Sequence, residues 1–249
     1  MQLDISDQVA LVTGSAHRVG KAIAIELAKA GVNILVHYHS SENDTVRETV
    51  QEIKSHGVDA FPVQANIALP DGVETVFAAL RERYGRLNIL VNSASVFHKK
   101  SFMEVTPEDW QRSLAVNLTA PLLCSQAAVP LMRSNDPSGG VIINICDYGS
   151  VRPWIDRVDH GVSKAGLLML TKVAAVSLGP EHVRVNGIVP GPVLQSAGLS
   201  DDMWARIGDR LPLGHTGEPG DVARAVVYLA SENFLTGTIL EVSGGEHLL

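Results

Sequence analysis

The sequence contains little cysteine and no excess of positive charge. Only Cys124 and Cys146 occur. Both lie in apolar stretches, so we expect buried free thiols, which suit a reducing cytoplasm. The 20 Lys and Arg are outnumbered by 27 Asp and Glu, which gives a net charge of −7. A nucleic-acid partner favours a basic face and is therefore not expected.

Targeting signals and long apolar runs are also missing. No basic segment precedes the first apolar run, Val9–Val12, which is too short for a signal peptide. No stretch approaches the roughly 20 apolar residues of a membrane span. We therefore expect a soluble cytoplasmic protein without a membrane partner.

What is present is an alternation of short β-rich runs and longer helical patterns. Apolar residues make up 45% of the chain, enough for a large core. The expected strands are Val9–Thr13, Asn33–Tyr38, Ala60–Gln64, Ile89–Asn92, Val141–Ile145, Arg184–Val189 and Thr238–Val242. The expected helices are Arg18–Ala30, Asp44–His56, Gly72–Tyr84, Pro107–Arg133, Gly161–Leu178 and Asp221–Ser231. This order predicts an α/β protein: one Rossmann-fold domain over residues 1–249, with a doubly wound, seven-stranded parallel sheet and helices on both faces.

Two segments need separate interpretation. In Gly161–Leu178, apolar residues recur at helical spacing and predict a stripe that faces the core, namely Val162, Ala165, Leu168, Met169, Val173 and Val176. Residues 190–219 are rich in proline and glycine and contain a helical pattern at Asp201–Arg210. This insertion suits a lid on the substrate side, and an ordinary surface excursion explains it equally well.

The first expected strand runs into a glycine-containing turn, Thr13–Gly20 (TGSAHRVG), and then a helix. Glycine permits close backbone approach, and the helix N-terminus offers free N–H groups to a pyrophosphate. This context predicts a dinucleotide site.

The end of the second expected strand lacks the acid that would bind the ribose of NAD. It reads His37-Tyr38-His39-Ser40-Ser41. Hydroxyls and imidazoles suit the 2′-phosphate of NADP, and Arg18 and Lys21 add positive charge nearby. NADP(H) is therefore favoured over NAD(H).

With these motifs the chain resembles the short-chain dehydrogenases/reductases over essentially its whole length. The matching pieces are Thr13–Gly20, Leu90–Ser95 (LVNSAS), Asn117, Lys164, Val183–Val193 (VRVNGIVPGPV), Gly220–Ser231 and Thr236–Gly245. Within the family it looks most like the pteridine reductases. Arg18, the HYHSS sequence and Asp147 at a position usually held by serine carry this likeness.

The resemblance implies an NADPH-dependent reductase of a small carbonyl or pterin-like substrate. It implies a homo-tetramer, or a homodimer, built through helix pairs, and no metal site. The implied cofactor residues are Gly14, His17, Arg18, Val19, Gly20, His37, His39, Ser40, Ser41, Asn66, Ile67, Asn92, Ser93, Ala94, Lys164, Pro190, Gly191 and Val193.

Several positions depart from the family pattern. Asn66 replaces an aspartate that reads adenine, Ser93 replaces an asparagine, and Ser40 replaces a basic residue. Gln195 stands where threonine commonly touches the nicotinamide amide. Most seriously, His160 stands where the family has its catalytic tyrosine, four residues before Lys164.

His160 keeps the family's thirteen-residue spacing from Asp147, so the site is substituted without being deleted. The resemblance implies catalytic roles for Asp147, His160 and Lys164, with Asn117 ordering a water relay. Histidine is a competent general acid with a reference pKa of about 6.5. A lysine nearby weakens it as an acid and an aspartate strengthens it, and the sequence leaves that balance open. Tyr148 is a second candidate donor.

Other functions stay open at this point. A chain without its acid can be a binding module that senses NADP(H) or joins a partner subunit. Within the enzyme class, a 3-oxoacyl thioester reductase or a general ketone reductase is the alternative. Candidate substrate contacts are Phe97, Tyr148 and Trp154, together with Met203 and Trp204 in the expected lid.

Overall fold

The computed structural model describes residues 3–196 and 198–249. Seven parallel strands form one sheet in the order β3-β2-β1-β4-β5-β6-β7. The strands are β1 (Val9–Val12), β2 (Asn33–Tyr38), β3 (Ala60–Gln64), β4 (Ile89–Asn92), β5 (Gly140–Ile145), β6 (Val183–Pro190) and β7 (Ile239–Val242). All seven expected strands are confirmed, with ends that differ by at most one residue.

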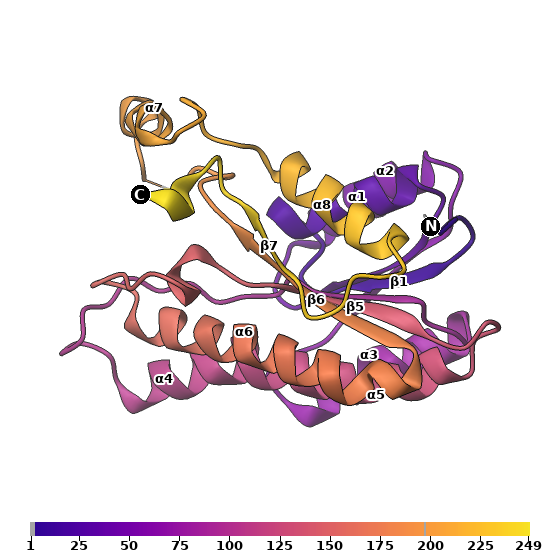
Figure 1. Ribbon diagram of the computed structural model, residues 1–249. Helices are drawn as coiled ribbons and strands as arrows, with labels where there is room; N and C mark the ends of the chain where they lie inside the picture. The colour runs from indigo at the N-terminus through magenta and orange to yellow at the C-terminus, as the bar shows by residue number, and fades with distance from the viewer. Residues whose placement is uncertain (1–2, 197) are drawn as a thin grey trace.

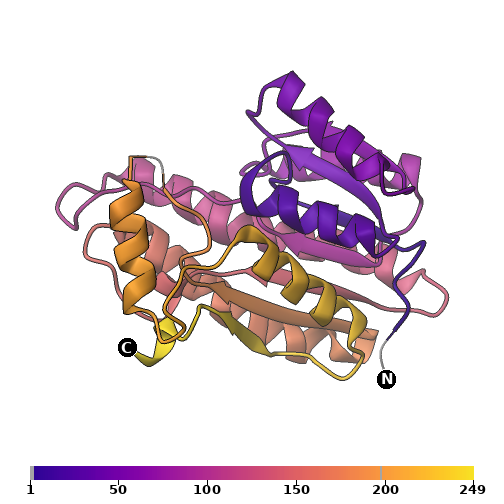
Figure 2. The ribbon, with the colours of Figure 1, turned by 90° about the horizontal axis from the view of Figure 1, so that it is seen from above.

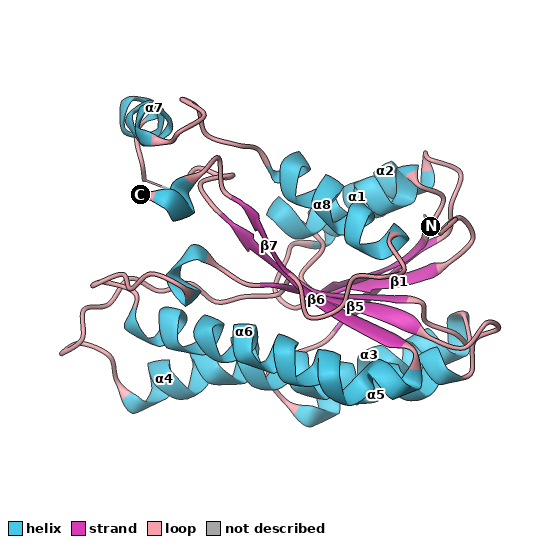
Figure 3. Ribbon diagram, in the orientation of Figure 1, coloured by secondary structure: helices cyan, strands magenta, loops and turns pink. Residues whose placement is uncertain are grey.

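Helices cover both faces of this sheet, as Figures 1 and 3 show. One face carries α1 (Arg18–Lys29), α2 (Asn43–Lys54) and α8 (Pro219–Ser231). The other carries α3 (Pro70–Arg83), α4 (Pro107–Leu114), α5 (Ala120–Arg133) and α6 (Val158–Leu178). The remaining helix, α7 (Asp201–Arg210), stands apart from both layers, near the C-terminal residues (Figure 2). The doubly wound single domain is therefore confirmed.

The strands are apolar on consecutive residues because each face of the sheet is covered. Ala10 and Val12 of β1 pack into the layer under α1 and α8, while Val9 and Leu11 pack into the layer on the opposite face. Alternating side chains thus enter two separate cores. Cys124 and Cys146 are buried and free, as expected, and burial raises their thiol pKa values to about 12 and about 11.

The helix expected over Pro107–Arg133 is interrupted by a π-helical turn. Helix α4 ends at Leu114, the turn spans Ala115–Thr119, and α5 follows. A π turn holds more residues per turn than an α-helix, which shifts the side chains around the helix axis. Here the side chain of Asn117 in the turn is completely buried.

The predicted core-facing stripe of α6 is wrong for most of its members. Val162, Met169, Val173 and Val176 are exposed, with Val176 82% accessible. The face of α6 toward the protein instead carries His160, Ser163, Lys164, Leu167, Thr171 and Ala175. The helix is apolar on its outer face and mixed on its inner face, so apolar spacing located a stripe but assigned it to the wrong side.

The outward stripe also contributes to a membrane-like composition. The stretches Pro107–Arg133 and Val158–Glu181 are long and apolar enough to cross a membrane. In the fold both belong to the helical layer on one face of the sheet (Figure 1). The expectation that no stretch approaches the length of a span is therefore wrong by length and composition, although one or two such helices are weak evidence of a membrane protein. Only 28% of each apolar window is buried inside the fold.

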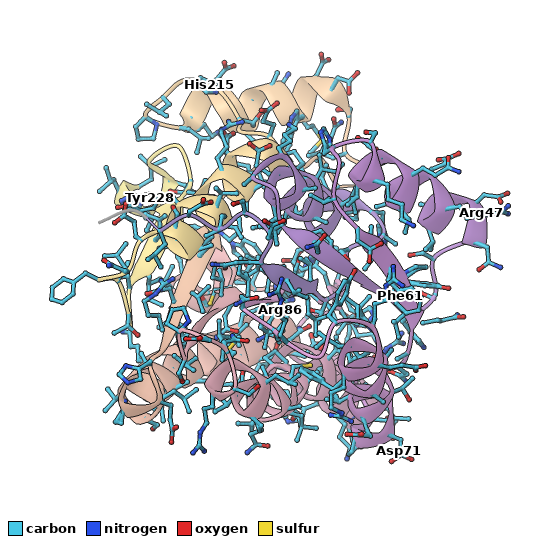
Figure 4. The ribbon with its side chains drawn as sticks, turned by 90° about the vertical axis from the view of Figure 1, so that its right-hand side faces the viewer. Arg47, Phe61, Asp71, Arg86, His215 and Tyr228 are labelled. Atoms are coloured by element: carbon cyan, nitrogen blue, oxygen red, sulfur yellow. The ribbon has the colours of Figure 1, made fainter. Side chains whose placement is uncertain are left out.

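The carboxyl ends of the strands meet at the left of Figure 1, where α7 and the loops after β4 and β5 lie. Ligands of open α/β sheets bind at this edge, where the strand order reverses between β1 and β4. Figure 4 views the opposite end, where Arg86 precedes β4 and donates a hydrogen bond to the carbonyl oxygen of Asp7.

Candidate active site

The loop after β1 forms a close backbone cradle. Gly14 adopts a positive φ of 66°, and a Cβ added there would lie 3.0 Å from Cα of Ala94. A Cβ on Gly20 would lie 2.3 Å from the carbonyl oxygen of Gly14. Helix α1 begins at Arg18 with no acidic residue in its first turn. Glycine is thus required at both positions, and the free helix terminus fits a dinucleotide pyrophosphate.

His37 holds this loop from below. Its Nδ1 accepts a hydrogen bond from the Gly14 N–H at 3.1 Å, and its Nε2 lies 3.1 Å from the carbonyl oxygen of Ala65. Burial lowers the pKa of His37 to about 4, so the ring is neutral at physiological pH. Both ring nitrogens are occupied by the protein. His37 therefore positions the loop, and neither ring nitrogen is left for the cofactor contact that was expected of it.

The residues after β2 contact the loop after β1 through a serine and a histidine. Ser41 Oγ lies 3.2 Å from Nδ1 of His17, and Ser40 and His39 are exposed beside them. Partial burial, with a smaller effect of Arg18, lowers the pKa of His17. Lys21, expected to add charge here, is instead paired with Glu52 at 2.8 Å.

Arg18 supplies the positive charge in its place. It is exposed at the start of α1, and no ion pair to it occurs among the described residues. With the hydroxyls of Ser40 and Ser41 nearby in the fold, this corner suits a phosphate group, and no carboxylate side chain follows β2 until Glu42.

The far rim of the site follows β3. Asn66 is exposed, and its Oδ1 accepts a hydrogen bond from the Ala68 N–H at 3.1 Å. This bond fixes the amide and leaves its nitrogen toward solvent. Ile67 beside it is buried.

The loop after β4 is tied to the loop after β1. Thr13 Oγ1 accepts hydrogen bonds from the N–H groups of Ser93 and Ala94 at 2.9 and 3.0 Å. Asn92 is buried and donates to Asn144 on β5 at 2.8 Å. The strand order that places β4 beside β1 thus fixes both loops together, and Ser93 contributes its backbone here.

The loop after β6, with Pro190, Gly191 and the buried Val193, completes the floor of this edge. A Cβ on Gly191 would lie 2.7 Å from Cα of Ser243, so the loop needs glycine to pass the chain after β7. Gln195 does not turn toward the floor. Its Nε2 donates to the carbonyl oxygen of Leu199 at 2.7 Å and to Asp201 at 3.1 Å, which anchors the start of α7.

Lys164 enters the site from α6. It is buried, and its Nζ donates a hydrogen bond of 2.7 Å to the carbonyl oxygen of Ile145, the last residue of β5. Burial lowers the pKa of Lys164, and the neighbouring Cys146 and Asp147 oppose this shift. An ammonium group is thus held beside the carboxyl end of β5.

His160 lies one helical turn before Lys164 and is 2% exposed. Its Nδ1 lies 2.9 Å from the carbonyl oxygen of Val96, and its Nε2 lies 3.5 Å from Oδ2 of Asp147. Within the described chain, this Nε2 has no hydrogen-bond partner. A buried nitrogen that can gain or release a proton therefore faces a carboxylate and is free to meet a substrate.

Asn117 does not have the arrangement that a water relay through its side chain requires. Its Oδ1 accepts from Ser95 Oγ at 3.1 Å and from the Val96 N–H at 2.9 Å. Its Nδ2 donates to the carbonyl oxygen of Val96 at 3.1 Å and to Ser163 Oγ at 3.0 Å. Four hydrogen bonds exhaust an amide side chain, so no capacity is left for an ordered water.

Two aromatic residues cover the outer side of His160. Trp154 lies parallel to the imidazole with ring centroids 6.5 Å apart, and Phe97 meets it edge-on at 4.6 Å. Arg157 lies over the other side of Phe97, 4.6 Å from its ring centre. Phe97 and Trp154 also meet each other edge-on, with ring centroids 5.9 Å apart, and their contact with a substrate stays a prediction.

The position of Tyr148 does not favour its expected role as a second proton donor. β5 ends at Ile145, and after Asp147 the chain forms a short 3₁₀ turn over Tyr148–Ser150. The Tyr148 hydroxyl donates to the carbonyl oxygen of Glu246 at 3.0 Å and accepts from Arg152. Its hydroxyl proton is therefore occupied, and His160 is the better placed donor.

A cavity of about 310 Å³ opens between this turn and α7. It is lined by Tyr148, Arg152, Pro153, Trp154, Ile207, Arg210, Leu211, Glu246 and Leu249. Met203 and Trp204 are not among the lining residues. Ile207, Arg210 and Glu246 were missed, because which face of α7 turns inward depends on the loop that carries the helix. Burial and the nearby Asp147 raise the pKa of Glu246.

Comparison with known proteins agrees with this geometry. A family model described as enoyl-(acyl carrier protein) reductase, adh_short_C2, matches residues 14–247. The chain belongs to the short-chain dehydrogenase/reductase family. The 3-oxoacyl-[acyl-carrier-protein] reductase FabG of Staphylococcus epidermidis is 32% identical over 243 residues, which is 96% of this chain and 98% of that protein.

Solved structures of this family superpose over nearly the whole chain. L-sorbose reductase from Gluconobacter frateurii, complexed with NADPH and L-sorbose, has a TM-score of 0.91 and 29% identity, covering 98% of both chains. The angucycline C-6 ketoreductase LanV with bound NADP has a TM-score of 0.90 and 33% identity, covering 100% of this chain and 99% of that chain. These relatives are named for different substrates. Membership of the family alone therefore does not identify the substrate of this chain.

Proposed function

We propose that this protein is an NADP(H)-dependent reductase of a small carbonyl or pterin-like compound, with His160 in the place of the family's tyrosine. One observation carries the proposal. The Nε2 atom of His160 is buried without a hydrogen-bond partner among the described residues and faces Asp147 at 3.5 Å. A side chain retained only for packing would have no need of that arrangement.

The cofactor proposal rests on the cradle of Gly14 and Gly20 and on the exposed cation at Arg18. The serine hydroxyls at Ser40 and Ser41 would donate hydrogen bonds to a 2′-phosphate, and Arg18 would pair with its charge. L-sorbose reductase is complexed with NADPH and LanV has bound NADP. When bound, NADPH supplies a hydride to the substrate carbon.

The proton chemistry belongs to the chain's own residues. His160 as imidazolium would give a proton from Nε2 to the carbonyl oxygen or imine nitrogen of the substrate. Asp147 stabilises the imidazolium by its negative charge. Lys164 holds its ammonium against the carbonyl oxygen of Ile145 and can also reach a ribose.

Two substrate classes fit the site. Phe97 and Trp154 meet edge-on with ring centroids 5.9 Å apart, so a flat ring would lie on the exposed side of Phe97 and not between the two. Such a contact suits a pterin, and Arg18, the HYHSS sequence and Asp147 resemble pteridine reductases. The relatives named above are reductases of a 3-oxoacyl thioester, of L-sorbose and of an angucycline ketone. They support a ketone or a 3-oxoacyl thioester as substrate as strongly as the resemblance supports a pterin. NADPH oxidation against dihydropterins, quinonoid compounds, ketones and 3-oxoacyl thioesters distinguishes them. Failure with every class, despite tight NADPH binding, would overturn the reductase.

The second candidate is a binding module that senses NADP(H). The loss of the tyrosine favours it, together with the changes at Ser93, Asn66 and Gln195. If NADPH changes the association of the protein with a partner subunit while no substrate turns over, this candidate replaces the first.

We also propose a homo-oligomer, a tetramer or a dimer, assembled through the exposed apolar face of α6. That face carries Val162, Met169, Val173 and Val176, with Leu122 of α5 also exposed. Isolated exposed apolar residues are normal, but a continuous stripe on one helix marks an interface. The lid role of residues 190–219 is proposed on the position of α7 beside the cavity, and a cytoplasmic location on the two free thiols.

A further inference from the structure

The carbonyl oxygen of Val96 is the closest polar contact of the His160 ring, at 2.9 Å from Nδ1. A carbonyl oxygen can only accept a hydrogen bond, so Nδ1 must carry a proton to make this contact favourable. Asn117 Nδ2 also lies near Nδ1, at 3.5 Å, but it is a donor and the longer of the two contacts. Oδ2 of Asp147, an acceptor that would favour a proton on Nε2, lies farther away, at 3.5 Å. The shorter contact to Val96 therefore determines the tautomer.

The orientation of Asn117 is fixed independently of His160. Its Oδ1 must face the Val96 N–H, because that backbone group can only donate, and its Nδ2 then faces the Val96 carbonyl oxygen. The amide thus brackets the backbone of Val96 from both sides. With Ser95 and Ser163 it has all four of its hydrogen bonds, and neither amide proton is left for Nδ1 of His160.

We propose that Asn117 is a positioning residue: by holding the carbonyl group of Val96 it fixes His160 in the tautomer with its proton on Nδ1, and so makes Nε2 the reacting nitrogen. This rests on the proposed function of His160. Asn117 acts through Val96 and touches neither substrate nor cofactor. A π-helical turn delivers its side chain to that place.

The consequence is a defined proton route. In the reduction, the Nε2–H bond of imidazolium would break and an O–H bond would form on the substrate, leaving neutral His160, while a bound NADPH would supply the hydride. Nε2 then regains a proton from water past Asp147, the carboxylate at 3.5 Å, which is 24% exposed. The side chain of Asn117 carries no proton along this route.

The tautomer is measured directly by ¹⁵N NMR of the imidazole nitrogens at a pH where the ring is neutral. The His160→Gln spectrum identifies the signals of His160 among the nine histidines. We expect the wild type to show a protonated Nδ1 and an unprotonated Nε2. In Asn117→Ala both signals should move toward the intermediate values of a tautomer mixture.

The matched control is Asn186→Ala. Asn186 is also buried, donates to the carbonyl oxygen of Leu235 at 2.9 Å, and accepts from the Thr238 N–H at 3.1 Å, away from the candidate site. It should lose stability as Asn117→Ala does without changing the His160 signals. If Asn117→Ala does not fold, Asn117→Leu removes the same hydrogen bonds without leaving a cavity.

A wild-type spectrum with the proton on Nε2 would overturn the proposal, and so would an unchanged Nδ1–H tautomer in a folded Asn117 variant. The measurement needs no substrate, so it is separable from the reductase proposal. A protein with the Nδ1–H tautomer, sensitive to Asn117, but with no turnover would retain the positioning role and lose the proposed function.

Discussion

Nε2 of His160 lies 3.5 Å from Oδ2 of Asp147 at the carboxyl edge of the sheet. A histidine donor differs from the family's tyrosine because its protonated form is a cation, whereas protonated tyrosine is neutral. The Asp147 carboxylate stabilises that cation. Lys164, held nearby on α6, acts in the opposite sense.

Replacing Asp147 by asparagine tests the carboxylate in this pair. Asparagine retains an oxygen that can accept from the Gly149 N–H, as Asp147 does at 2.7 Å, and removes only the charge. We expect kcat/KM to fall about tenfold or more, because the amide no longer stabilises the positive charge of the proton donor. Asp59→Asn, which breaks the ion pair with Arg83 at 2.8 Å just before β3, is the control and should leave kcat/KM unchanged.

Arg18 and Lys21 make a matched pair for cofactor choice. Arg18→Ala should weaken NADPH binding about tenfold, since a hydrogen bond to a charged group contributes about 1.5 kcal/mol, and should leave NADH binding almost unchanged. Lys21→Ala should have little effect on either cofactor, because its charge is already paired with Glu52. Fluorescence titration measures both, and equal losses for NADPH and NADH would refute the 2′-phosphate assignment.

His37 should make the folded protein less stable at acidic pH. Its pKa is about 4 when folded against about 6.5 when unfolded, so the unfolded chain binds a proton first as pH falls. Stability from this residue is therefore complete above about pH 6.5 and is lost down to about pH 4, by about 3 kcal/mol. Urea unfolding should show this loss reduced in His37→Gln, whose amide can replace both hydrogen bonds without titrating.

The exposed His215 provides the comparison for that experiment. His215→Gln should show the same acid-side loss as the wild type. If His37→Gln loses as much stability between pH 6.5 and 4 as the wild type does, His37 is not the titrating group.

The outer stripe of α6 should hold subunits together. Val173→Glu places a charge in that stripe, and we expect it to reduce the molar mass in solution to that of a smaller assembly, because a buried unpaired charge is costly. Light scattering after size exclusion measures the mass. Phe61→Glu, on the outer strand β3 (Figure 4), should leave it unchanged. A wild type that is already monomeric would contradict the interface.

The fold was predictable because strands that are buried on both faces of a sheet are apolar at consecutive positions. Such runs can be recognised in the sequence. The seven strands and the doubly wound order follow from these runs and from the helical patterns between them. The break in Pro107–Arg133 was not predictable, because a π turn has no composition of its own. The stripe of α6 failed because spacing gives a face but not the direction in which that face points.

The site was predictable where chemistry follows a strand end, as at Gly14, Asp147 and Gly191. Prediction failed for side chains whose hydrogen-bond partner is a backbone group. The inward turn of His37 and the bond from His160 to Val96 depend on carbonyl groups brought together by the sheet, and no sequence pattern marks a carbonyl. The prediction that Lys21 adds free positive charge failed because its ion-pair partner, Glu52, lies on a different helix.

The most direct test of the account compares wild type with His160→Tyr in NADPH oxidation from acid to mildly alkaline pH, with the best substrate of the panel. The account predicts that the wild type turns over, and that its rate falls as pH rises through the range in which histidine loses its proton. His160→Tyr should extend activity to higher pH. A wild type silent at every pH, beside an active His160→Tyr, would contradict the central claim and leave a cofactor-binding scaffold without its acid.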